Sequence, residues 1–136
     1  AVCTPHIGEL AHITGLSTKQ VLDTYMDLGL DLAKRSGATW VIKGIPSVVA
    51  TPDGEIFINP IGNPGMGSGG MGDTLSGIIA AYIAQGYSSK LAALIGVYLH
   101  SAAADNLAKD KAWGYTASDV AKEVGHVVTD FLADQD

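Results

Sequence analysis

Apolar residues recur every three or four positions over several stretches of this chain, a spacing that predicts amphipathic helices. The clearest stretch follows Ser17, which with Gln20 has the spacing of a capping box, and it stops at Gly37, a common helix end. We therefore predict a helix over residues 17–36. The same spacing predicts further helices over residues 9–13, 73–85 and 89–109, and a last helix that begins after Thr116.

β-Branched and aromatic residues at positions 39–43 predict a strand. Residues 47–51 and 55–59 flank a Pro-Asp-Gly turn, which predicts a β-hairpin. Residues 1–3 have the character of a strand end. Helices that alternate with strands predict a layered α/β fold.

Only three or four strands are predicted, fewer than a sheet covered by helices on both faces usually has. We therefore expect residues 1–136 to form either a single domain or the C-terminal part of a larger one, whose N-terminal strands precede Ala1.

Composition narrows the possible functions. The chain has 136 residues, 47% of them hydrophobic, and a net charge of −6, which argues against a general nucleic-acid-binding surface. The single cysteine, Cys3, forms no internal disulfide and fits a reducing cytoplasm. Polar residues such as Lys90 and His100 interrupt the apolar stretches, so we expect no membrane segment. The four histidines are scattered, and we expect no metal site built from protein groups alone.

A glycine-rich run from Gly65 to Gly72, followed by Asp73, leads directly into a predicted helix. The start of a helix has unpaired N–H groups and a positive dipole end, and glycines allow close approach of an anion. A dinucleotide fingerprint does not fit, because the position of its acidic residue falls within a helix pattern. A Walker A loop does not fit either, because Asp73 stands where that loop has lysine. An anion hole is the favoured interpretation, and a tight turn with a helix cap is the alternative.

Asp73 repels phosphate unless the carboxylate has a chemical task. Taking a proton from an attacking hydroxyl group is such a task. The position of this acid therefore predicts a catalytic base beside the anion hole.

Three segments together resemble the ADP/ATP-dependent NAD(P)H-hydrate dehydratases, a ribokinase-like family. They are residues 4–9 (T-P-H-I-G-E), 41–47 (V-I-K-G-I-P-S) and 62–73 (G-N-P-G-M, then G-G-M-G-D). The first segment is the most specific to this family, whereas the last is shared with many ribokinase-like kinases. Ile7, Ser47 and Met71 depart from the usual residues of the family.

The resemblance implies a ribokinase-like α/β/α sandwich, of which this chain is the C-terminal part, and it implies roles for particular residues. Asp73 is implied as the catalytic base beside the substrate hydroxyl, and His6 as a contact of the substrate. The implied nucleotide site consists of Lys43, Gly44, Ile45, Pro46, Ser47 and Gly72. The implied anion hole consists of Gly69, Gly70, Met71 and Gly72.

The implied reaction repairs hydrated NADH or NADPH with ADP or ATP as co-substrate and Mg²⁺. The hydroxyl of the hydrated ring is phosphorylated, and phosphate, a better leaving group than hydroxide, is then eliminated. The resemblance also implies a cytoplasmic homo-oligomer that binds neither nucleic acid nor membrane. The family's domain includes an N-terminal half that this chain lacks.

Other interpretations stay open at this point. The chain could be a ribokinase-like kinase of a vitamin-precursor alcohol, or a non-catalytic fragment of such an enzyme. Lys43 could be an ordinary strand-end lysine and His6 a helix-capping residue. Trp113 and Tyr115 could flank an adenine ring, although sealing the edge of the core is the favoured interpretation.

Overall fold

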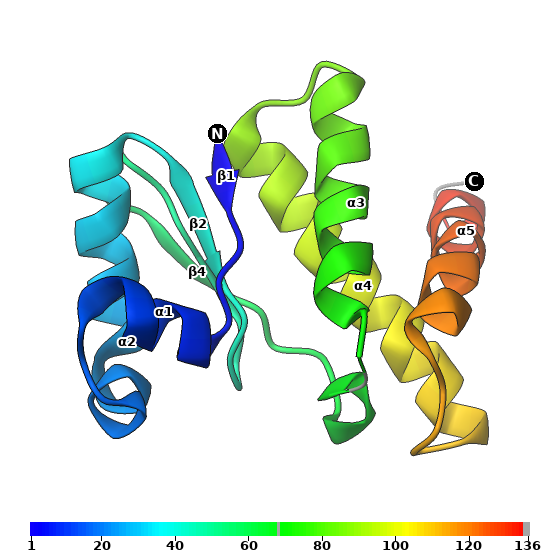
Figure 1. The fold of residues 1–136 in the computed structure, drawn as a ribbon. Coiled ribbons are helices and arrows are strands. Elements are labelled where there is room, and N and C mark those ends of the chain that lie inside the picture. Colours follow the sequence, from blue (N-terminus) through cyan, green and yellow to red (C-terminus); the bar gives the residue numbers. More distant parts are fainter. Residues whose placement is uncertain (68, 135–136) are drawn as a thin grey trace. The chain divides into compact units, whose positions relative to one another are not determined.

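A computed structural model describes residues 1–67 and 69–134 (Figure 1). The chain forms two compact units, which are described separately. The sheet unit comprises residues 1–59 and 87–94, and the helical unit comprises residues 60–86 and 95–136. The prediction of one domain over residues 1–136, or of the C-terminal part of a larger domain, stays a prediction.

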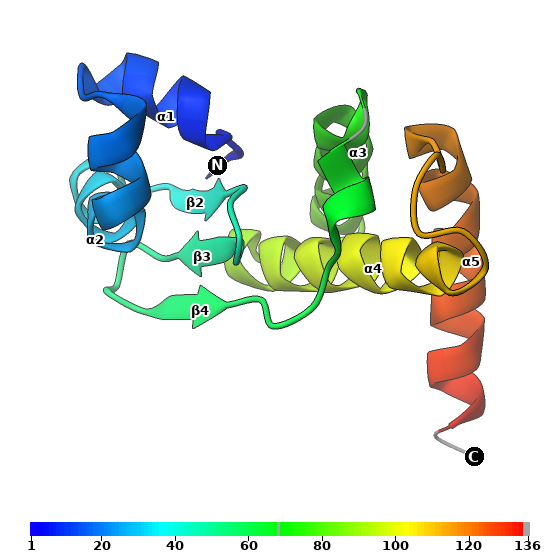
Figure 2. The same ribbon diagram turned by 90° about the horizontal axis from the view of Figure 1, so that it is seen from below.

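Four strands form the sheet of the sheet unit in the order β1-β2-β3-β4, and Figure 2 shows the last three side by side. These strands are β1 (Val2–Cys3), β2 (Thr39–Ile42), β3 (Val48–Ala50) and β4 (Ile56–Ile58). Strands β1 and β2 are parallel, whereas the other two pairs are antiparallel. The predicted strand over 39–43 and the predicted hairpin are confirmed, each strand being shorter by a residue at one or both ends.

Helices α1 (Ile7–Thr14) and α2 (Thr18–Ser36) belong to this unit and pack against one face of the sheet (Figure 1). Trp40 and Ile42 alternate along β2 and pack in one core with Val21 and Tyr25 of α2. Gly29 of α2 is required for this packing, because a Cβ atom there would lie 2.6 Å from Ile42 Cδ1. Every residue of β2 and β3 is buried, as expected for strands that are covered on both faces.

The predicted start of α1 is wrong by two residues. The helix begins at Ile7 rather than at Glu9, because His6 is its N-cap residue. The open interpretation of His6 as a helix-capping residue is therefore confirmed. Histidine is outside the usual set of N-cap residues, and the apolar pattern by itself placed the helix start too late. The predicted capping box of α2, formed by Ser17 and Gln20, is confirmed.

The helical unit consists of α3 (Met71–Ala84), α5 (Ala117–Ala133), all but the first turns of α4 (Ser89–Asp110), and a 3₁₀ turn, η1 (Pro64–Gly67). Helix α4 crosses α3 and α5, and residues from all three share one core (Figure 2). Gly96 permits the close approach of α4 to α3, since a Cβ atom there would lie 2.5 Å from Ile79 Cγ1. Helix α3 begins at Met71, so Asp73 is its third residue rather than its first.

Helix α4 is long and apolar enough to cross a membrane, judged by length and composition alone. The interruptions at Lys90 and His100 therefore do not exclude such a span. Half of the apolar window is buried within the protein, and the core helix of a folded domain passes the same test. The absence of membrane contact stays a prediction.

Candidate functional site

His6 and Lys43 follow the two parallel strands of the sheet unit. His6 comes after β1 and Lys43 directly after β2, and the two residues form an isolated parallel bridge. The Lys43 N–H donates to the carbonyl of Pro5 at 3.0 Å. The structure therefore brings these two predicted site residues side by side at the carboxyl end of parallel strands, where ligands of α/β proteins commonly bind.

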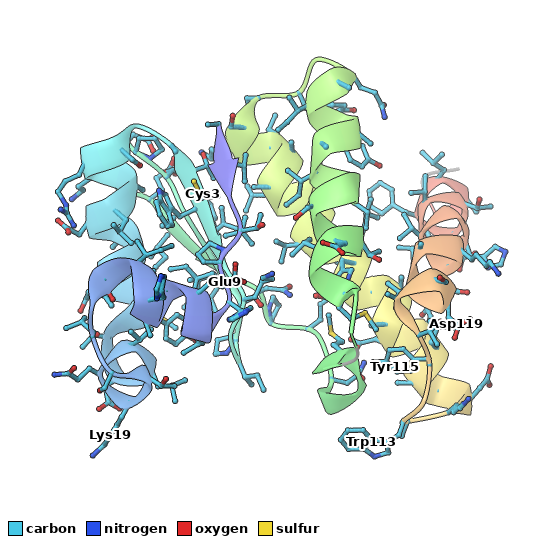
Figure 3. The ribbon with its side chains drawn as sticks, viewed as in Figure 1. Cys3, Glu9, Lys19, Trp113, Tyr115 and Asp119 are labelled. Atoms are coloured by element: carbon cyan, nitrogen blue, oxygen red, sulfur yellow. The ribbon has the colours of Figure 1, made fainter. Side chains whose placement is uncertain are left out.

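The His6 side chain acts as a helix cap. Its Nδ1 atom accepts the Glu9 N–H at 3.1 Å, and the His6 N–H donates to Glu9 Oε1 at 3.3 Å (Glu9 is labelled in Figure 3). Nε2 lies 3.0 Å from the same carboxylate oxygen. Because Nδ1 accepts a hydrogen bond, the proton of the neutral ring is on Nε2. The side chain is 58% exposed, so the capping role leaves a face of the ring open to a ligand.

The predicted nucleotide loop, residues 43–47, is held at its end by two side chains. The Ser47 hydroxyl donates to the carbonyl of Gly44 at 3.1 Å and accepts its N–H at 3.3 Å. The Tyr25 hydroxyl donates to the carbonyl of Pro46 at 2.6 Å. Ile45, between these anchors, is 96% exposed. The loop thus has a fixed backbone and presents one apolar side chain to solvent.

Tyr25, which holds this loop, leads to a prediction about the stability of the protein at alkaline pH. Burial raises the pKa of Tyr25 above its ordinary value. Above about pH 10 the unfolded chain therefore binds fewer protons than the folded chain, and the free energy of unfolding falls as pH rises. Tyr25→Phe should flatten this decline, measured by denaturant unfolding between pH 8 and pH 11.

A second variant serves as the comparison for that experiment. Burial is also the main cause of the raised pKa of Tyr115, and the charge of Asp105 adds to it. Tyr115→Phe should flatten the alkaline decline in the same way, and the double variant should flatten it further. Equal slopes in the wild type and in the double variant would contradict the assignment.

In the helical unit, Asp73 lies in the first turn of α3 and is exposed. The N-cap residue is Gly70, which has φ 84° and no side chain to cap the helix. The first helical hydrogen bond runs from the Thr74 N–H to the carbonyl of Gly70, so the N–H groups of residues 71–73 have no partner within the helix. Helices α1, α2 and α5 all have capping boxes instead. The start of α3 can therefore receive an anion.

The glycines of this loop fall into two groups: in one the surrounding protein leaves no room for a side chain, and in the other it does. A Cβ atom on Gly65 would lie 2.6 Å from the Tyr115 ring and 2.7 Å from the carbonyl oxygen of Ala112. A Cβ atom on Gly67 or Gly69 would meet nothing within 4 Å, and neither residue has a positive φ. Nothing in the described part of the chain requires glycine at these two positions, which is consistent with a ligand that approaches the backbone there.

Sequence reasoning missed the polar residues behind this loop. Asn63 Nδ2 donates to Asp105 Oδ1 at 2.8 Å, and the Tyr115 hydroxyl donates to Asn63 Oδ1. Asp105 carries no signal in the sequence, because it is one polar residue within a long helix. Tyr115 is 3% exposed, which confirms that it seals the core, whereas Trp113 is 66% exposed (Figure 3).

Comparison with known proteins assigns the chain to a family. A family model described as NAD(P)H-hydrate dehydratase matches residues 1–125. The chain belongs to the NAD(P)H-hydrate dehydratase family. This confirms the resemblance inferred from the three sequence segments.

Individual relatives agree with this NAD(P)H-hydrate dehydratase assignment. The chain is 40% identical over 124 residues to an ADP-dependent (S)-NAD(P)H-hydrate dehydratase of Xanthomonas campestris, covering 90% of this chain and 43% of the relative. It is 41% identical over 110 residues to a bifunctional NAD(P)H-hydrate repair enzyme of Moorella thermoacetica, covering 81% of this chain and 21% of that protein.

A solved structure confirms the predicted ribokinase-like α/β fold. The ADP/ATP-dependent NAD(P)H-hydrate dehydratase of Bacillus subtilis, co-crystallised with ATP and Mg²⁺, matches with a TM-score of 0.88 and 32% identity. The match covers 96% of this chain and 47% of that structure. A ribokinase-like protein of Enterococcus faecalis matches with a TM-score of 0.76 and 32% identity, covering 96% of this chain and 44% of that one. The chain thus spans less than half the length of these relatives.

The predicted dehydratase site residues fall into two groups. His6 and residues 43–47 belong to the sheet unit, whereas residues 69–73 belong to the helical unit. Each group has the local geometry described above. Their individual roles stay predictions.

Proposed function

We propose that the protein containing this chain dehydrates hydrated NADH and NADPH in a reaction that uses ADP or ATP. The observation that carries this proposal is the exposed carboxylate of Asp73 in the first turn of α3, next to helix N–H groups with no intrahelical partner. The names of the relatives from Xanthomonas campestris and Bacillus subtilis support the substrate and the nucleotide.

In this mechanism Asp73 orients the hydroxyl of the hydrated ring and accepts its proton as the oxygen attacks the terminal phosphoryl group. The bond from that phosphorus to the bridging oxygen breaks, and the nucleotide leaves as AMP when ADP is used or as ADP when ATP is used. The N–H groups at the start of α3, including that of Gly72, stabilise the charge on the transferred group. Loss of phosphate together with a ring proton then restores the double bond of the reduced nicotinamide. His6 contacts the hydrated ring, and Lys43 contacts the nucleotide phosphates.

The chemistry of the donors fits a Mg²⁺ ion bound with the nucleotide. Residues 1–67 and 69–134 contain no group of three or more His, Cys, Asp or Glu side chains that could hold a metal by themselves. Mg²⁺ beside a nucleotide is usually held by one or two carboxylates and by phosphate oxygens. The phosphate oxygens of the nucleotide would supply most of its ligands, and the ion would neutralise phosphate charge.

The direct test uses the full-length protein with hydrated NADH and either ADP or ATP. We expect NADH absorbance to return only when a nucleotide is present. Turnover of an alcohol acceptor without recovery of NADH would overturn the proposal in favour of a small-molecule kinase.

Sedimentation of the same sample tests the expected homo-oligomer, and fractionation of cells tests the expected cytoplasmic location.

The proposed anion hole leads to a separate prediction about nucleotide affinity in a variant of Gly69. Gly69→Ala places a methyl group where the described protein leaves open space, so the fold should tolerate it. We expect nucleotide affinity to fall by about 10-fold or more, since a bound phosphate loses charge-assisted hydrogen bonds. Calorimetric titration with ADP and ATP measures this change.

The matched control for that experiment is Gly77→Ala, within α3, which also adds a methyl group in open space. It should leave the affinity unchanged. Unchanged affinity in Gly69→Ala as well would contradict the anion hole.

Lys43 is tested by a variant that keeps its apolar stem. Lys43→Met removes the ammonium group and retains a side chain of similar length. We expect the dissociation constant of the nucleotide to rise about 10- to 100-fold, the effect of losing a charged hydrogen bond to phosphate. Lys19→Met, at an exposed position in α2, is the control (Figure 3). If Lys43→Met binds nucleotide like the wild type, Lys43 is only a strand-end lysine.

A further inference from the structure

Asn63 is the centre of a polar cluster in the helical unit. Its amide nitrogen donates to Asp105 Oδ1 at 2.8 Å, and its amide oxygen accepts the Gly65 N–H at 3.1 Å and the Tyr115 hydroxyl. The second oxygen of Asp105 accepts the Gly62 N–H at 3.3 Å. One side chain thus ties the segment ahead of α3 to α4 and to the segment ahead of α5.

This cluster is partly buried and closely packed. Tyr115, in the segment ahead of α5, is 3% exposed (Figure 3). Gly65 fits against the Tyr115 ring with no room for a Cβ atom. The cluster therefore holds the backbone of residues 62–65 at four points, namely two N–H groups, one amide side chain and one van der Waals contact.

We propose that Asn63, Asp105 and Tyr115 are positioning residues that hold the segment ahead of α3 in the geometry that binds phosphate. This inference rests on the proposed function. The three side chains act through the backbone of residues 62–65 and touch no substrate.

The physical reason is the entropy of the glycine loop. Gly67, Gly69 and Gly70 separate the cluster from the first turn of α3, and a glycine-rich segment loses more conformational freedom than any other when it is ordered. If the segment is already ordered in the free protein, binding of the anion does not have to order it, and no conformational entropy is lost in that step. The affinity for the anion is then higher.

The charges of the cluster agree with this role. The carboxylate of Asp105 is engaged within the cluster, since both of its oxygens accept hydrogen bonds from the segment itself. The Tyr115 hydroxyl donates to Asn63 Oδ1, and a tyrosine hydroxyl, with its ordinary pKa of about 10, keeps its proton at neutral pH. Asn63, which is uncharged, connects the acid and the phenol to the loop.

The test compares Tyr115→Phe and Asp105→Asn in the full-length protein with Tyr98→Phe and Asp110→Asn, which change exposed residues in the middle and at the end of α4. The dissociation constants of ADP and ATP are measured by calorimetry well below the melting temperature. We expect each positioning variant to raise them about three- to tenfold, by analogy with the loss of one hydrogen bond. The two controls should bind like the wild type.

A kinetic comparison separates positioning from simple support of the fold. In the positioning variants, KM for the nucleotide should rise while KM for hydrated NADH stays the same. The double variant Tyr115→Phe/Asp105→Asn should raise the dissociation constant by less than the product of the single effects, because both residues act through Asn63. A lower melting temperature with unchanged nucleotide affinity and unchanged KM would overturn the inference, as would fully independent effects.

The outcomes also distinguish this inference from the proposed function. If the wild type binds nucleotide but repairs no hydrated NADH, the proposed function is wrong, and the dissociation constants still decide the inference. If the wild type repairs hydrated NADH and both positioning variants bind nucleotide normally, the inference alone is wrong. If the wild type binds neither ADP nor ATP, both are wrong.

Discussion

Replacing Asp73 by asparagine is expected to lower the turnover of hydrated NADH by about 10²- to 10⁴-fold, the usual contribution of a general base. Asparagine has nearly the same shape but cannot accept the proton of the attacking hydroxyl. Nucleotide binding should be retained or become tighter, because a negative charge next to the phosphates is removed. The measurements are steady-state kinetics with ADP and ATP and a separate titration of each nucleotide.

The chain offers a matched control in the same unit. Asp119 is the third residue of α5, as Asp73 is of α3, but its carboxylate accepts the Thr116 N–H at 2.8 Å in a capping box. Asp119→Asn should keep normal turnover and reduce the stability of the helix start. Turnover near the wild-type level in Asp73→Asn would show that Asp73 is not the base.

Gly65→Ala is expected to destabilise the helical unit by about 1–3 kcal/mol, the usual cost of overpacking a closely packed site. The added methyl group would lie 2.6 Å from the Tyr115 ring and 2.7 Å from the carbonyl oxygen of Ala112, so one or both must move. Movement of Tyr115 also breaks its hydrogen bond to Asn63, and the nucleotide affinity should fall with the stability. Denaturant unfolding and calorimetric titration measure the two effects.

Gly67→Ala is the control for that variant, since its methyl group would meet nothing within 4 Å. We expect it to change the free energy of unfolding by less than Gly65→Ala. Equal stability of the two variants would mean that the contact between Gly65 and Tyr115 does not hold the segment.

The helices were predictable where their signals are local. The capping box predicted at Ser17 is confirmed, and the last helix begins after Thr116 as predicted, with a second capping box there. The β3–β4 hairpin was predictable for the same reason, because its turn residues are adjacent. The start of α1 was misplaced because His6 caps it through a ring nitrogen, which the usual capping pattern does not include.

The site was predictable only in part. The glycine run and Asp73 were evident from the chain, because a helix start with an acid in its first turn is a local feature. The sequence did not distinguish Gly65, which packs against Tyr115, from Gly67 and Gly69, which have open space. It also placed no role on Tyr25, whose hydroxyl holds the loop of residues 43–47.

The sequence by itself determined the family, the α/β class and most helix boundaries, and it predicts the residues of the nucleotide and anion sites. Only the tertiary structure showed that His6 and Lys43 are bridged at the end of parallel strands, and that Asp105 and Tyr115 hold Asn63. The physical reason is the distance along the sequence between the residues that interact. Caps and turns depend on residues within about four positions of each other, whereas Asn63 meets partners 42 and 52 positions away, which no local pattern encodes.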